Sequence, residues 1–500
     1  MTWETLDVVV AGAGPVGLMQ ACELRLAGLH PLVLERAAEP STAPKANGLC
    51  GRIVDTLDHR GLLARFAESA SYSGPFPGFP FGSVPLPFAV LGASPLRGMA
   101  LPQPDLERLL GDRARELGVE IRRGHELVGL AQDGEAVHAD VRGPDGRYRV
   151  RTRYLVGCDG ARSFVRDAAG IGFSGDTAPD LLRLGHFHAE STAGLFDDVA
   201  MEVPGIGPLE RGWNRTPRGR VLVTSLRPGV YIVGTYETGG PPAGSGTPMA
   251  VGELQDSVER VLGARLPLGE PIWLSRTRGQ ARLADRYRQG RVLVAGDAAH
   301  LFPAGGSSLN VGMLDAVNLG WKLGAIGTRG APPALLDSYE AERRPVAERT
   351  LRHTRAQAAL DRATGRDGDA LRDLLTELFA LEQPLRRLGG LLHGSDTRYG
   401  DHAHPLVGRF VPDLKLSTET GHTRVAALLH EANPVLLDLA DRPDLRAVAA
   451  DHHVTVVTAR SDDPSADTVL IRPDGYVAFA ADGSTVDDLR AVLATWCGTA

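Results

Sequence analysis

The sequence predicts an α/β protein of several domains, the first built on a Rossmann-like parallel sheet. A hydrophobic run at 8–11 leads through three glycines into a helical pattern, and two later runs end in Asp159–Gly160 and Gly296–Asp297. Strands that alternate with helices in this way predict a doubly wound sheet. A single core stops growing near about 250–300 residues, so for 500 residues we expect two or three domains.

The composition is that of a globular chain without a basic surface. The formal net charge of -7 argues against a nucleic-acid or anionic-membrane partner, because both need a positive field. Glu4 and Asp7 stand where a signal peptide would be basic, and no apolar run approaches the roughly 18 residues of a membrane span. The four cysteines form no CxxC pair, so no metal site and no disulfide framework are expected. We expect a cytoplasmic protein.

The turn after the first strand has the spacing of a dinucleotide-binding motif. Gly12 makes the tight turn, Gly14 lets backbone N–H groups approach a pyrophosphate, and Gly17 lets the helix pack closely on the strand. Glu35 closes a second hydrophobic strand at the separation where a carboxylate reaches ribose hydroxyls. A plain strand-to-helix corner is the alternative for the glycines alone. With Glu35 the stretch predicts a dinucleotide site and does not separate NAD from FAD.

Asp159 and Asp297 are the next candidates. Both would lie at the carboxyl ends of sheet strands, where open α/β sheets place their ligands. Asp297 is suited to accept hydrogen bonds from a sugar-alcohol chain. Taken singly, each pair with its glycine is better explained as a turn.

The order of these motifs resembles that of a known family. A GxGxxG turn, a central DG and a late GD-AAH-P-GG-N stretch occur together in the class A flavin monooxygenases related to para-hydroxybenzoate hydroxylase. "LPQPDLERLL" (101–110) and "DSYEAERRPVAE" (337–348) are similar to further segments of that family. The resemblance covers about 5–350. It implies that the opening turn holds the ADP half of FAD and that Asp297 lies at its ribitol–pyrophosphate side.

The resemblance also assigns the flavin-binding residues one by one. Gln103 matches a glutamine that contacts the flavin, and Arg52 matches an arginine near it. The implied FAD-binding residues are Gly12, Gly14, Pro15, Gly17, Glu35, Arg36, Lys45, Arg52, Gln103, Asp159, Gly160, Gly296, Asp297, Pro303, Gly305, Gly306, Leu309 and Asn310.

Two positions depart from the family pattern. The stretch before Leu309–Asn310 is usually Gly-Gly-Gln-Gly, but here it ends in Ser307–Ser308, which removes easy access to positive φ. We expect FAD to bind with a different loop conformation, in which Ser307 or Ser308 caps a helix that begins near Asn310. Lys45 replaces a common arginine and loses its planar fork, which weakens the case for a direct flavin contact there.

The remaining segments set the domain boundaries. Alternating apolar segments within 176–274, such as "RGRVLVTSLRPGVYIVGTYE", predict a second sheet. The predicted fold is α/β, a Rossmann-like FAD-binding domain with an inserted mixed-sheet substrate domain and a C-terminal thioredoxin-like domain. The expected boundaries are 1–75, 100–175 and 275–365 for the FAD-binding domain, 76–99 and 176–274 for the substrate-binding domain, 366–399 for a helical connection and 400–500 for the thioredoxin-like domain.

The C-terminal part resembles the thioredoxin-like appendage of phenol hydroxylase and of the hydroxylases of bacterial aromatic polyketides. Thiol redox activity is excluded, because no CxxC occurs and Cys497 is solitary. The resemblance therefore implies a structural or dimer-supporting role, in a monomer or a homodimer.

A flat ligand would need aromatic contacts, and several aromatic residues fall in the expected substrate domain. Each of them is otherwise explained as part of a core. The candidate substrate residues are Phe79, Phe81, Phe187, His188, Trp213 and Tyr231.

The resemblance implies a reaction as well. NADPH or NADH would reduce FAD, molecular oxygen would give a flavin C4a-hydroperoxide, and its distal oxygen would pass to a polycyclic aromatic polyketide. The cofactor supplies this chemistry, so we expect no catalytic side chain. His300 invites a catalytic role but is better explained as a residue that holds its loop.

Three alternatives stay open. A Baeyer–Villiger or antibiotic-inactivating oxygenase would use the same scaffold. A flavin-binding protein without oxygenase activity would show no substrate-stimulated NADPH oxidation. A nicotinamide-dependent dehydrogenase would carry no bound yellow flavin.

Overall fold

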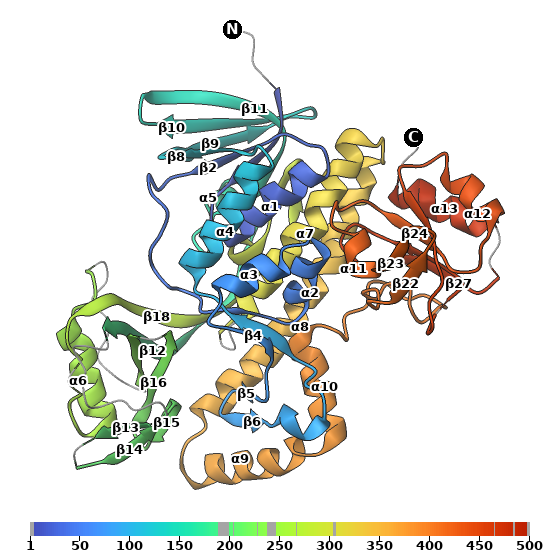
Figure 1. Cartoon of the computed structure of the whole chain (residues 1–500). Helices are drawn as coiled ribbons and strands as arrows, with labels where there is room; N and C mark the ends of the chain where they lie inside the picture. Colours follow the sequence, from blue (N-terminus) through green and yellow to red (C-terminus); the bar gives the residue numbers. More distant parts are fainter. Residues whose placement is uncertain are drawn as a thin grey trace.

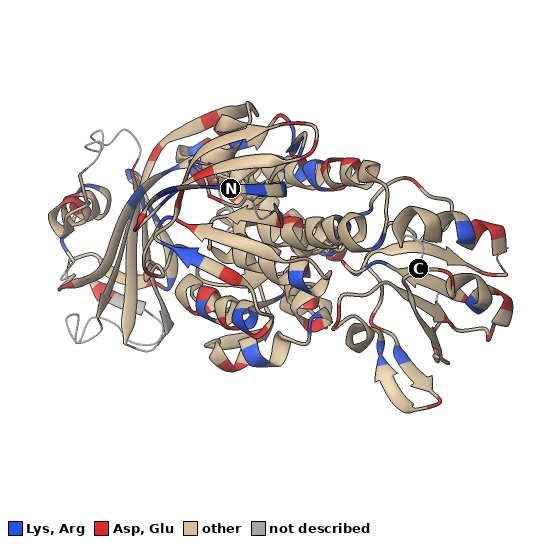
Figure 2. Cartoon of the chain, turned by 90° about the horizontal axis from the view of Figure 1, so that it is seen from above, with Lys and Arg blue, Asp and Glu red and all other residues tan. Residues whose placement is uncertain are grey.

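The computed structural model describes three packed domains. It covers residues 5–188, 200–203, 205–227, 229–237, 247–266, 268–303, 307–464, 466–483 and 486–497. The first domain lies between a second domain, built on its own sheet, and the C-terminal domain (Figures 1 and 2). Within these residues no helix is long and apolar enough to cross a membrane.

The first domain is built on a mostly parallel sheet. Across it run β19 (Arg288–Gln289), β20 (Val292–Val294), β11 (Gly146–Gly157), β1 (Thr5–Ala11), β2 (Pro31–Glu35) and β8 (Glu120–Arg123). Neighbouring strands from β20 to β8 are parallel, and β19 pairs antiparallel at one edge. Off this path, β10 (Val137–Gly143) pairs antiparallel with β11, and β9 (Glu126–Gln132) pairs antiparallel with β10. The buried strands are runs of Val and Leu, as expected of a sheet covered on both faces.

Helices cover this sheet, and two of them approach unusually closely. The helices are α1 (Pro15–Leu26), α2 (Arg52–His59), α3 (Leu63–Ser69), α4 (Gln103–Glu116), α5 (Phe164–Ala168) and α7 (Ser307–Thr328). A Cβ at Gly324 would lie 2.2 Å from the Cβ of Ala27, and one at Gly320 would lie 2.5 Å from the Cβ of Glu23. Small residues on α7 therefore let its backbone press against α1 and the residues that follow it.

The second domain is an antiparallel sheet with one helix on one face. Across it run β15 (Gly212–Thr216), β16 (Gly219–Arg227), β17 (Val230–Glu237), β12 (Phe173–His188), β18 (Pro271–Ala284) and β21 (His300–Leu301). The helix α6 (Val251–Leu262) covers one face, and β13 (Ala200–Val203) pairs with β14 (Gly207–Glu210) beside it. The sheet therefore extends past the expected boundary at residue 274, because β18 runs to Ala284 before the chain re-enters the first domain.

The segment 76–99 was expected in the second domain, and the structure contradicts this. The hairpin of β5 (Phe79–Phe81) and β6 (Val84–Leu86) is paired only within itself, and β3 (Leu49–Cys50), β7 (Arg97–Ala100) and β4 (Tyr72–Pro75) form a separate sheet. The hairpin packs on a helical region, as the cluster of Phe81, Leu86, Leu360 and Leu385 shows. That region consists of α8 (Asp337–Arg362), α9 (Gly365–Phe379) and α10 (Glu382–His393). The apolar face of the hairpin is thus buried against helices instead of against the second sheet.

The C-terminal domain has a β-α-β unit followed by an antiparallel hairpin and a helix. The strand order is β25 (Thr455–Thr458), β24 (Val435–Asp438), β26 (Thr468–Ile471) and β27 (Val477–Ala481), of which only β24 and β25 are parallel. The helices are α11 (Val425–Leu428), α12 (Pro443–Ala449) and α13 (Val486–Trp496), and β22 (Lys415–Thr418) pairs with β23 (Gly421–Arg424). This is the predicted thioredoxin-like arrangement. All four cysteines of the chain are free.

Buried charges fix the C-terminal domain to the first domain. Arg472, which follows β26, forms hydrogen-bonded ion pairs with Glu342 of α8 and with Asp474. Lys322 of α7 reaches the same Glu342 carboxylate at 2.8 Å, and its ammonium is fully buried. The Arg472 guanidinium also lies over the ring of Trp496 at 4.7 Å. Since a buried charge without its partner is strongly unfavourable, these contacts hold the two domains in one relative position.

Replacing Arg472 by Leu should destabilise the protein by about 3–5 kcal/mol, because it leaves the Glu342 and Asp474 carboxylates buried with one cation. Urea unfolding followed by tryptophan fluorescence measures this change. Arg442→Leu is the matched control, since its pair with Asp444 is on the surface of the same domain, and we expect its midpoint to equal that of the native chain. Equal midpoints for both variants would refute this account of the domain contact.

Candidate functional site

The candidate site lies along one edge of the first sheet. The strands β2, β1, β11 and β20 are adjacent and parallel, so their carboxyl ends meet there. This arrangement brings together Glu35, the turn at Gly12, the Asp159–Gly160 pair and the Gly296–Asp297 pair, which are far apart in the sequence. Ligands of open α/β sheets bind at such an edge.

The glycine-rich turn is held by backbone hydrogen bonds and by one carboxylate. The amide of Gly12 donates to the carbonyl of Leu34 at 2.8 Å. The Glu35 carboxylate accepts from the amide of Ala13 at 2.8 Å and, through its other oxygen, from the amide of Ala37 at 2.8 Å. Glu35 therefore fixes the shape of the turn as well as ending the second strand.

The turn leaves open space in front of α1. A Cβ on Gly17 would lie 1.9 Å from the carbonyl oxygen of Gly12, so only glycine lets the helix approach the strand. A Cβ on Gly14, in contrast, would meet no atom within 4 Å. No side chain caps the N-terminus of α1, so its first N–H groups face that space. An open cradle lined by backbone N–H groups fits a pyrophosphate.

Asp297 is held by a hydroxyl from the start of α7. Ser308 donates to the Asp297 carboxylate at 2.8 Å. The predicted helix start near Asn310 is wrong, because α7 begins at Ser307. Ser308 therefore lies inside the first turn and orients Asp297 instead of capping the helix.

Asn310 fixes the start of α7 by its side chain. Its amide oxygen accepts from the backbone N–H of Cys50 at 3.0 Å, and its amide nitrogen lies 3.5 Å from the Cys50 sulfur. Leu309 before it is half-buried against the core of the first domain. Gly305 and Gly306 lie outside the described residues.

Two of the expected flavin contacts are already engaged within the protein. Asp159 accepts from the Ser163 hydroxyl at 2.5 Å and from the amide of Val165 at 3.0 Å, which caps α5. The side-chain amide of Gln103 donates to Glu107 at 2.7 Å. Burial raises the pKa of both carboxyl groups, Asp159 and Glu107. Asp159 therefore holds a local turn, as its alternative interpretation predicted. It also lies at the edge of the sheet where the ligand is expected.

The basic candidates lie in different surroundings. Arg36 and Lys45 are exposed. Arg52 pairs with Asp55 at 2.8 Å and lies over the ring of Phe410 at 4.2 Å, so its guanidinium contacts the C-terminal domain.

The carbonyl oxygen of Pro303 would be 3.0 Å from a Cβ on Gly279 of β18, so the loop after Asp297 passes directly against the second sheet.

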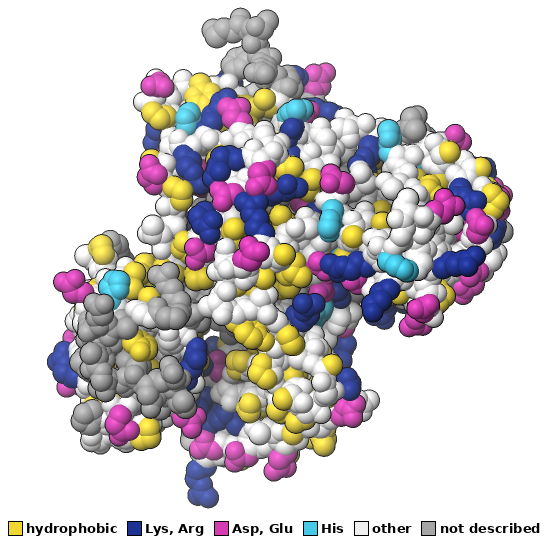
Figure 3. All heavy atoms as spheres, viewed as in Figure 1, with side chains coloured by type: hydrophobic (Ala, Val, Ile, Leu, Met, Phe, Trp, Pro, Cys, Tyr) yellow, Lys and Arg dark blue, Asp and Glu magenta, His cyan; other side chains and the backbone are white. Residues whose placement is uncertain are grey.

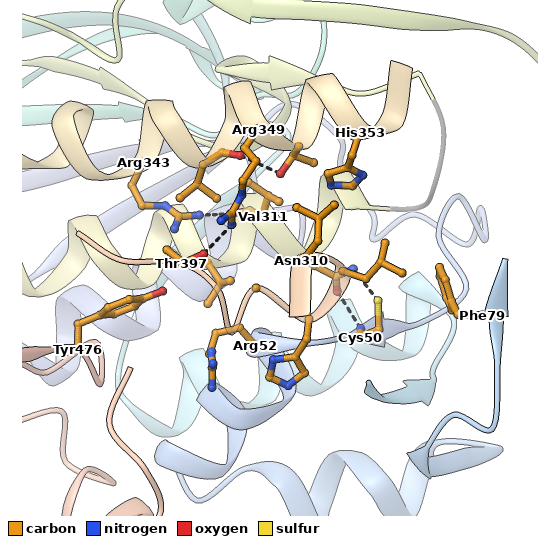
Figure 4. Close-up of a pocket in the computed structure, with 17 residues that line it drawn as sticks. Cys50, Arg52, Phe79, Asn310, Val311, Arg343, Arg349, His353, Thr397 and Tyr476 are labelled. Carbon is orange, nitrogen blue, oxygen red and sulfur yellow. Dashed lines mark hydrogen bonds between the residues drawn. The ribbon is translucent and has the colours of Figure 1, made fainter. Parts of the chain in front are cut away.

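A small cavity, of about 50 Å³, opens beside the first turn of α7. Figure 4 shows Arg349 and His353 of α8 on one side of it and Asn310, Cys50 and Arg52 on the other. Phe79, Leu314 and Leu392 line it with apolar atoms, whereas Arg349 pairs with Asp396 at 2.9 Å.

Burial disfavours the charged forms of two histidines and one thiol that line this cavity, beside its paired arginines. Burial and the charges of Arg349 and Arg352 lower the pKa of His353 to about 4. Burial, Arg52 and Arg97 lower the pKa of His393 to about 3. The Asp55 carboxylate, 3.4 Å from His393, would favour its charged form, but burial and the two guanidinium groups outweigh it. Burial likewise raises the pKa of the Cys50 thiol to about 11.

Two candidate substrate residues, Phe187 and Phe81, are core residues instead, and a third, Tyr231, is half-buried. Phe187 is fully buried under α6, because it shares a face of β12 with Arg183 and Gly185. Tyr231 is the direct cross-strand partner of Phe187 and lies on that same face. Phe81 is 6% exposed and meets the ring of Phe379 edge-on, inside the helical region.

The other three keep exposed surface. Phe79 lines the cavity beside Asn310. Trp213 is 39% exposed, and the Arg220 guanidinium lies 4.7 Å above its ring. His188 is exposed at the end of β12.

The most connected residue near the site was missed by sequence reasoning. Asp315 is fully buried in α7 and accepts from the amide of Gly296 at 3.2 Å, from Arg343 at 2.8 Å, and lies 2.7 Å from His300. Burial would raise the pKa of Asp315, but the charges and hydrogen bonds of His300 and Arg343 outweigh it and lower that pKa. The expectation that His300 holds its loop is confirmed.

A signal for this network exists in the sequence. Asp315, Asn318 and Lys322 follow one another at spacings of three and four within an otherwise apolar stretch. That spacing places them on one face of a helix, so a buried polar stripe could have been predicted, although its partners could not.

Comparison with known proteins agrees with this geometry. The chain matches the family described as FAD binding domain over residues 5–354 and the family described as Aromatic-ring hydroxylase, C-terminal over residues 404–500. It is 42% identical over 508 residues to the 12-dehydrotetracycline 5-monooxygenase/anhydrotetracycline 6-monooxygenase of Streptomyces rimosus, covering 98% of this chain and 99% of that protein. It is 40% identical to the dialkyldecalin synthase of Streptomyces rugosporus over 99% of both. The crystal structure of CabE, an aromatic hydroxylase from angucycline biosynthesis, superposes with a TM-score of 0.88 at 36% identity, over 99% of this chain and 100% of that one.

The chain therefore belongs to the FAD-dependent aromatic-ring hydroxylases and is, by class, an FAD-dependent monooxygenase. Its cofactor is FAD, and the class uses NAD(P)H as the reductant.

His353, whose pKa is lowered in the folded protein, should make the free energy of unfolding depend on pH. An unfolded histidine has a pKa of about 6.5, so between about pH 6.5 and 4 the unfolded chain binds a proton that folded His353 does not. Stability therefore falls as the pH falls through this window, by about 2 kcal/mol at pH 5 from this residue.

His353→Asn keeps an acceptor for Gln357 and removes this titration. We expect its loss of stability between pH 7.5 and pH 5, measured by urea unfolding, to be smaller than that of the native chain by about 2 kcal/mol. His453→Asn, at an exposed position, is the control and should behave as the native chain. An unaltered pH dependence in His353→Asn would show that this histidine is not held neutral.

Proposed function

We propose that the protein hydroxylates a polycyclic aromatic polyketide, using FAD, NAD(P)H and molecular oxygen. The observation that carries the proposal is similarity over the whole chain to tetracycline and angucycline hydroxylases, combined with the open cradle at the edge of the first sheet. Bound FAD supplies the oxygen chemistry. The protein must bind it, orient it, and exclude water from the reacting atoms.

FAD would lie along the edge that joins Glu35, Gly12 and Asp297. Its pyrophosphate would meet the N–H groups before and within the first turn of α1, in the space in front of Gly14. Glu35 would accept from ribose hydroxyls, and Asp297, oriented by Ser308, from the ribitol chain. The N-terminus of α7, which carries Leu309 and Asn310, would stabilise negative charge on the reduced flavin.

The substrate would lie against the face of the second sheet opposite α6. Along β12, the residues of this face alternate with the buried Arg183 and Phe187. Three leucines of the face are only half-buried, namely Leu182 and Leu184 of β12 and Leu222 of β16. The contact between Gly279 and Pro303 brings this sheet to the loop that follows Asp297. Figure 3 shows the surface hollowed between the second domain and the helical region around β5 and β6. A half-buried apolar face beside a flavin suits flat aromatic rings.

A second candidate is a reaction without oxygen transfer on the same scaffold. It is favoured by the relative named dialkyldecalin synthase, which is nearly as similar as the tetracycline enzyme, and by Ser308, which replaces a glycine of the usual pattern. The two candidates differ in whether oxygen appears in the product.

Gly14→Ala should weaken FAD binding by about tenfold without affecting the fold. The added methyl group meets nothing in the protein, so the thermal midpoint of the FAD-free chain should not change, but it projects toward the pyrophosphate. Gly17→Ala is the contrasting variant, because its Cβ clashes with backbone and should destabilise the protein by at least about 2 kcal/mol. Equilibrium titration with FAD measures the affinity. Native affinity in Gly14→Ala would exclude the proposed FAD position.

Incubation with NADPH, ¹⁸O₂ and tetracyclic or angucyclic aromatic polyketides tests the reaction. We expect NADPH oxidation that the substrate stimulates, and a product that carries one ¹⁸O atom as a hydroxyl stable to mild alkali. A labelled product that gains water in alkali would instead indicate Baeyer–Villiger insertion. Conversion of a substrate without label, or no stimulated oxidation, would contradict hydroxylation and favour the second candidate.

A further inference from the structure

Three buried side chains, beginning with Tyr399 at the entrance to the C-terminal domain, lead from that domain to the expected FAD-binding edge. The Arg343 guanidinium donates to the Tyr399 hydroxyl at 2.8 Å and to one oxygen of Asp315 at 2.8 Å. The other oxygen of Asp315 accepts from the amide of Gly296 at 3.2 Å. Arg343 also donates to the carbonyl of Val311 at 3.2 Å, directly after the first turn of α7. Arg343 is thus bonded to both elements that would face the flavin, directly to α7 and through Asp315 to the Gly296–Asp297 turn.

Every member of this series is shielded from water. Asp315 is 0% exposed, Arg343 1% and Tyr399 6%. The ionic groups therefore interact at low dielectric, where a lost hydrogen bond is not replaced by a bond to solvent. Loss of the Tyr399 hydroxyl must therefore alter the position of Arg343 and of the groups to which Arg343 is hydrogen-bonded.

Tyr399 is itself positioned by the C-terminal domain. Its ring stacks on that of Tyr476 at 4.1 Å between centroids, and its amide donates to the carbonyl of Gly408 at 2.8 Å. The Arg472 guanidinium lies 5.4 Å from the Tyr399 ring, so the ion pairs that dock the domain also pack against this residue. The place of the Tyr399 hydroxyl is therefore determined by the docked domain.

We propose that Tyr399 is a positioning residue for FAD. Through Arg343 and Asp315 the docked C-terminal domain sets the conformation of the Gly296–Asp297 turn and of the first turn of α7, and so the affinity for FAD and the surroundings of the bound flavin. This goes beyond the structural or dimer-supporting role expected of the domain. It rests on the proposed placement of FAD beside Asp297.

The test uses the full-length chain with Tyr399→Phe, which removes the hydroxyl and keeps the stacked ring. We expect the Kd for FAD to rise five- to tenfold, with a change in the visible circular dichroism of the bound flavin. Tyr476→Phe is the matched control, because it removes a hydroxyl from the other ring of the same stack, and this hydroxyl makes no hydrogen bond with Arg343 although it lies within reach of the Arg343 charge. The thermal midpoints of both FAD-free variants are measured, since an anchor of the domain alone would change these and not the flavin spectrum.

Asp297→Ala is titrated alongside to separate the two proposals. Weaker FAD binding and an altered flavin spectrum in Tyr399→Phe, but not in Tyr476→Phe, would support the inference. Native affinity and spectrum in Tyr399→Phe, with weaker binding in Asp297→Ala, would overturn the inference and leave the FAD placement intact. Native affinity in Asp297→Ala would overturn the placement and the inference with it.

Discussion

The arrangement of the site depends on the hydrogen bonds made by the buried carboxylate of Asp315. It accepts from the amide of Gly296, which follows β20, and from Arg343 of α8, and it contacts His300 in β21 at the edge of the second sheet. A buried carboxylate is tolerated only when its lone pairs are satisfied, so these partners hold one another in place. The first sheet, the second sheet and the helical region therefore meet around a single charged group.

The second constraint is the close approach of backbones at the edge of the first sheet. Gly17 packs against the carbonyl of Gly12, and a Cβ on Gly312 of α7 would lie 2.8 Å from the Cα of Gly296. These contacts bring α1 and α7 so near the strand ends that no side chain separates them. The space left in front of Gly14 is a consequence, and a dinucleotide can reach backbone N–H groups there.

The C-terminal domain is held by charge and aromatic contacts in the same interface. The ion pairs of Arg472 with Glu342 and Asp474 are buried, and Trp321 and Trp496 pack around them. Buried ion pairs add little net stability compared with apolar packing, but they penalise every arrangement that separates the partners. The domain is consequently docked in one orientation, which is what lets the Tyr399 hydroxyl stand at a fixed place beside Arg343.

The sequence alone determined the class of the fold, the glycine-rich turn, the strand ends that carry Glu35 and Asp297, the thioredoxin-like domain and the family. These are local features, because the hydrophobic periodicity of strands and helices and the spacing of motifs depend on residues that are close in the sequence. Only the tertiary structure decided that Asp315 joins Gly296, His300 and Arg343, that Ser308 orients Asp297, and that 76–99 packs on helices. It also decided that Phe187 faces α6. Alternation along a strand defines two faces but does not say which of them the protein covers, and a buried charge finds its partners in segments that the sequence does not place together.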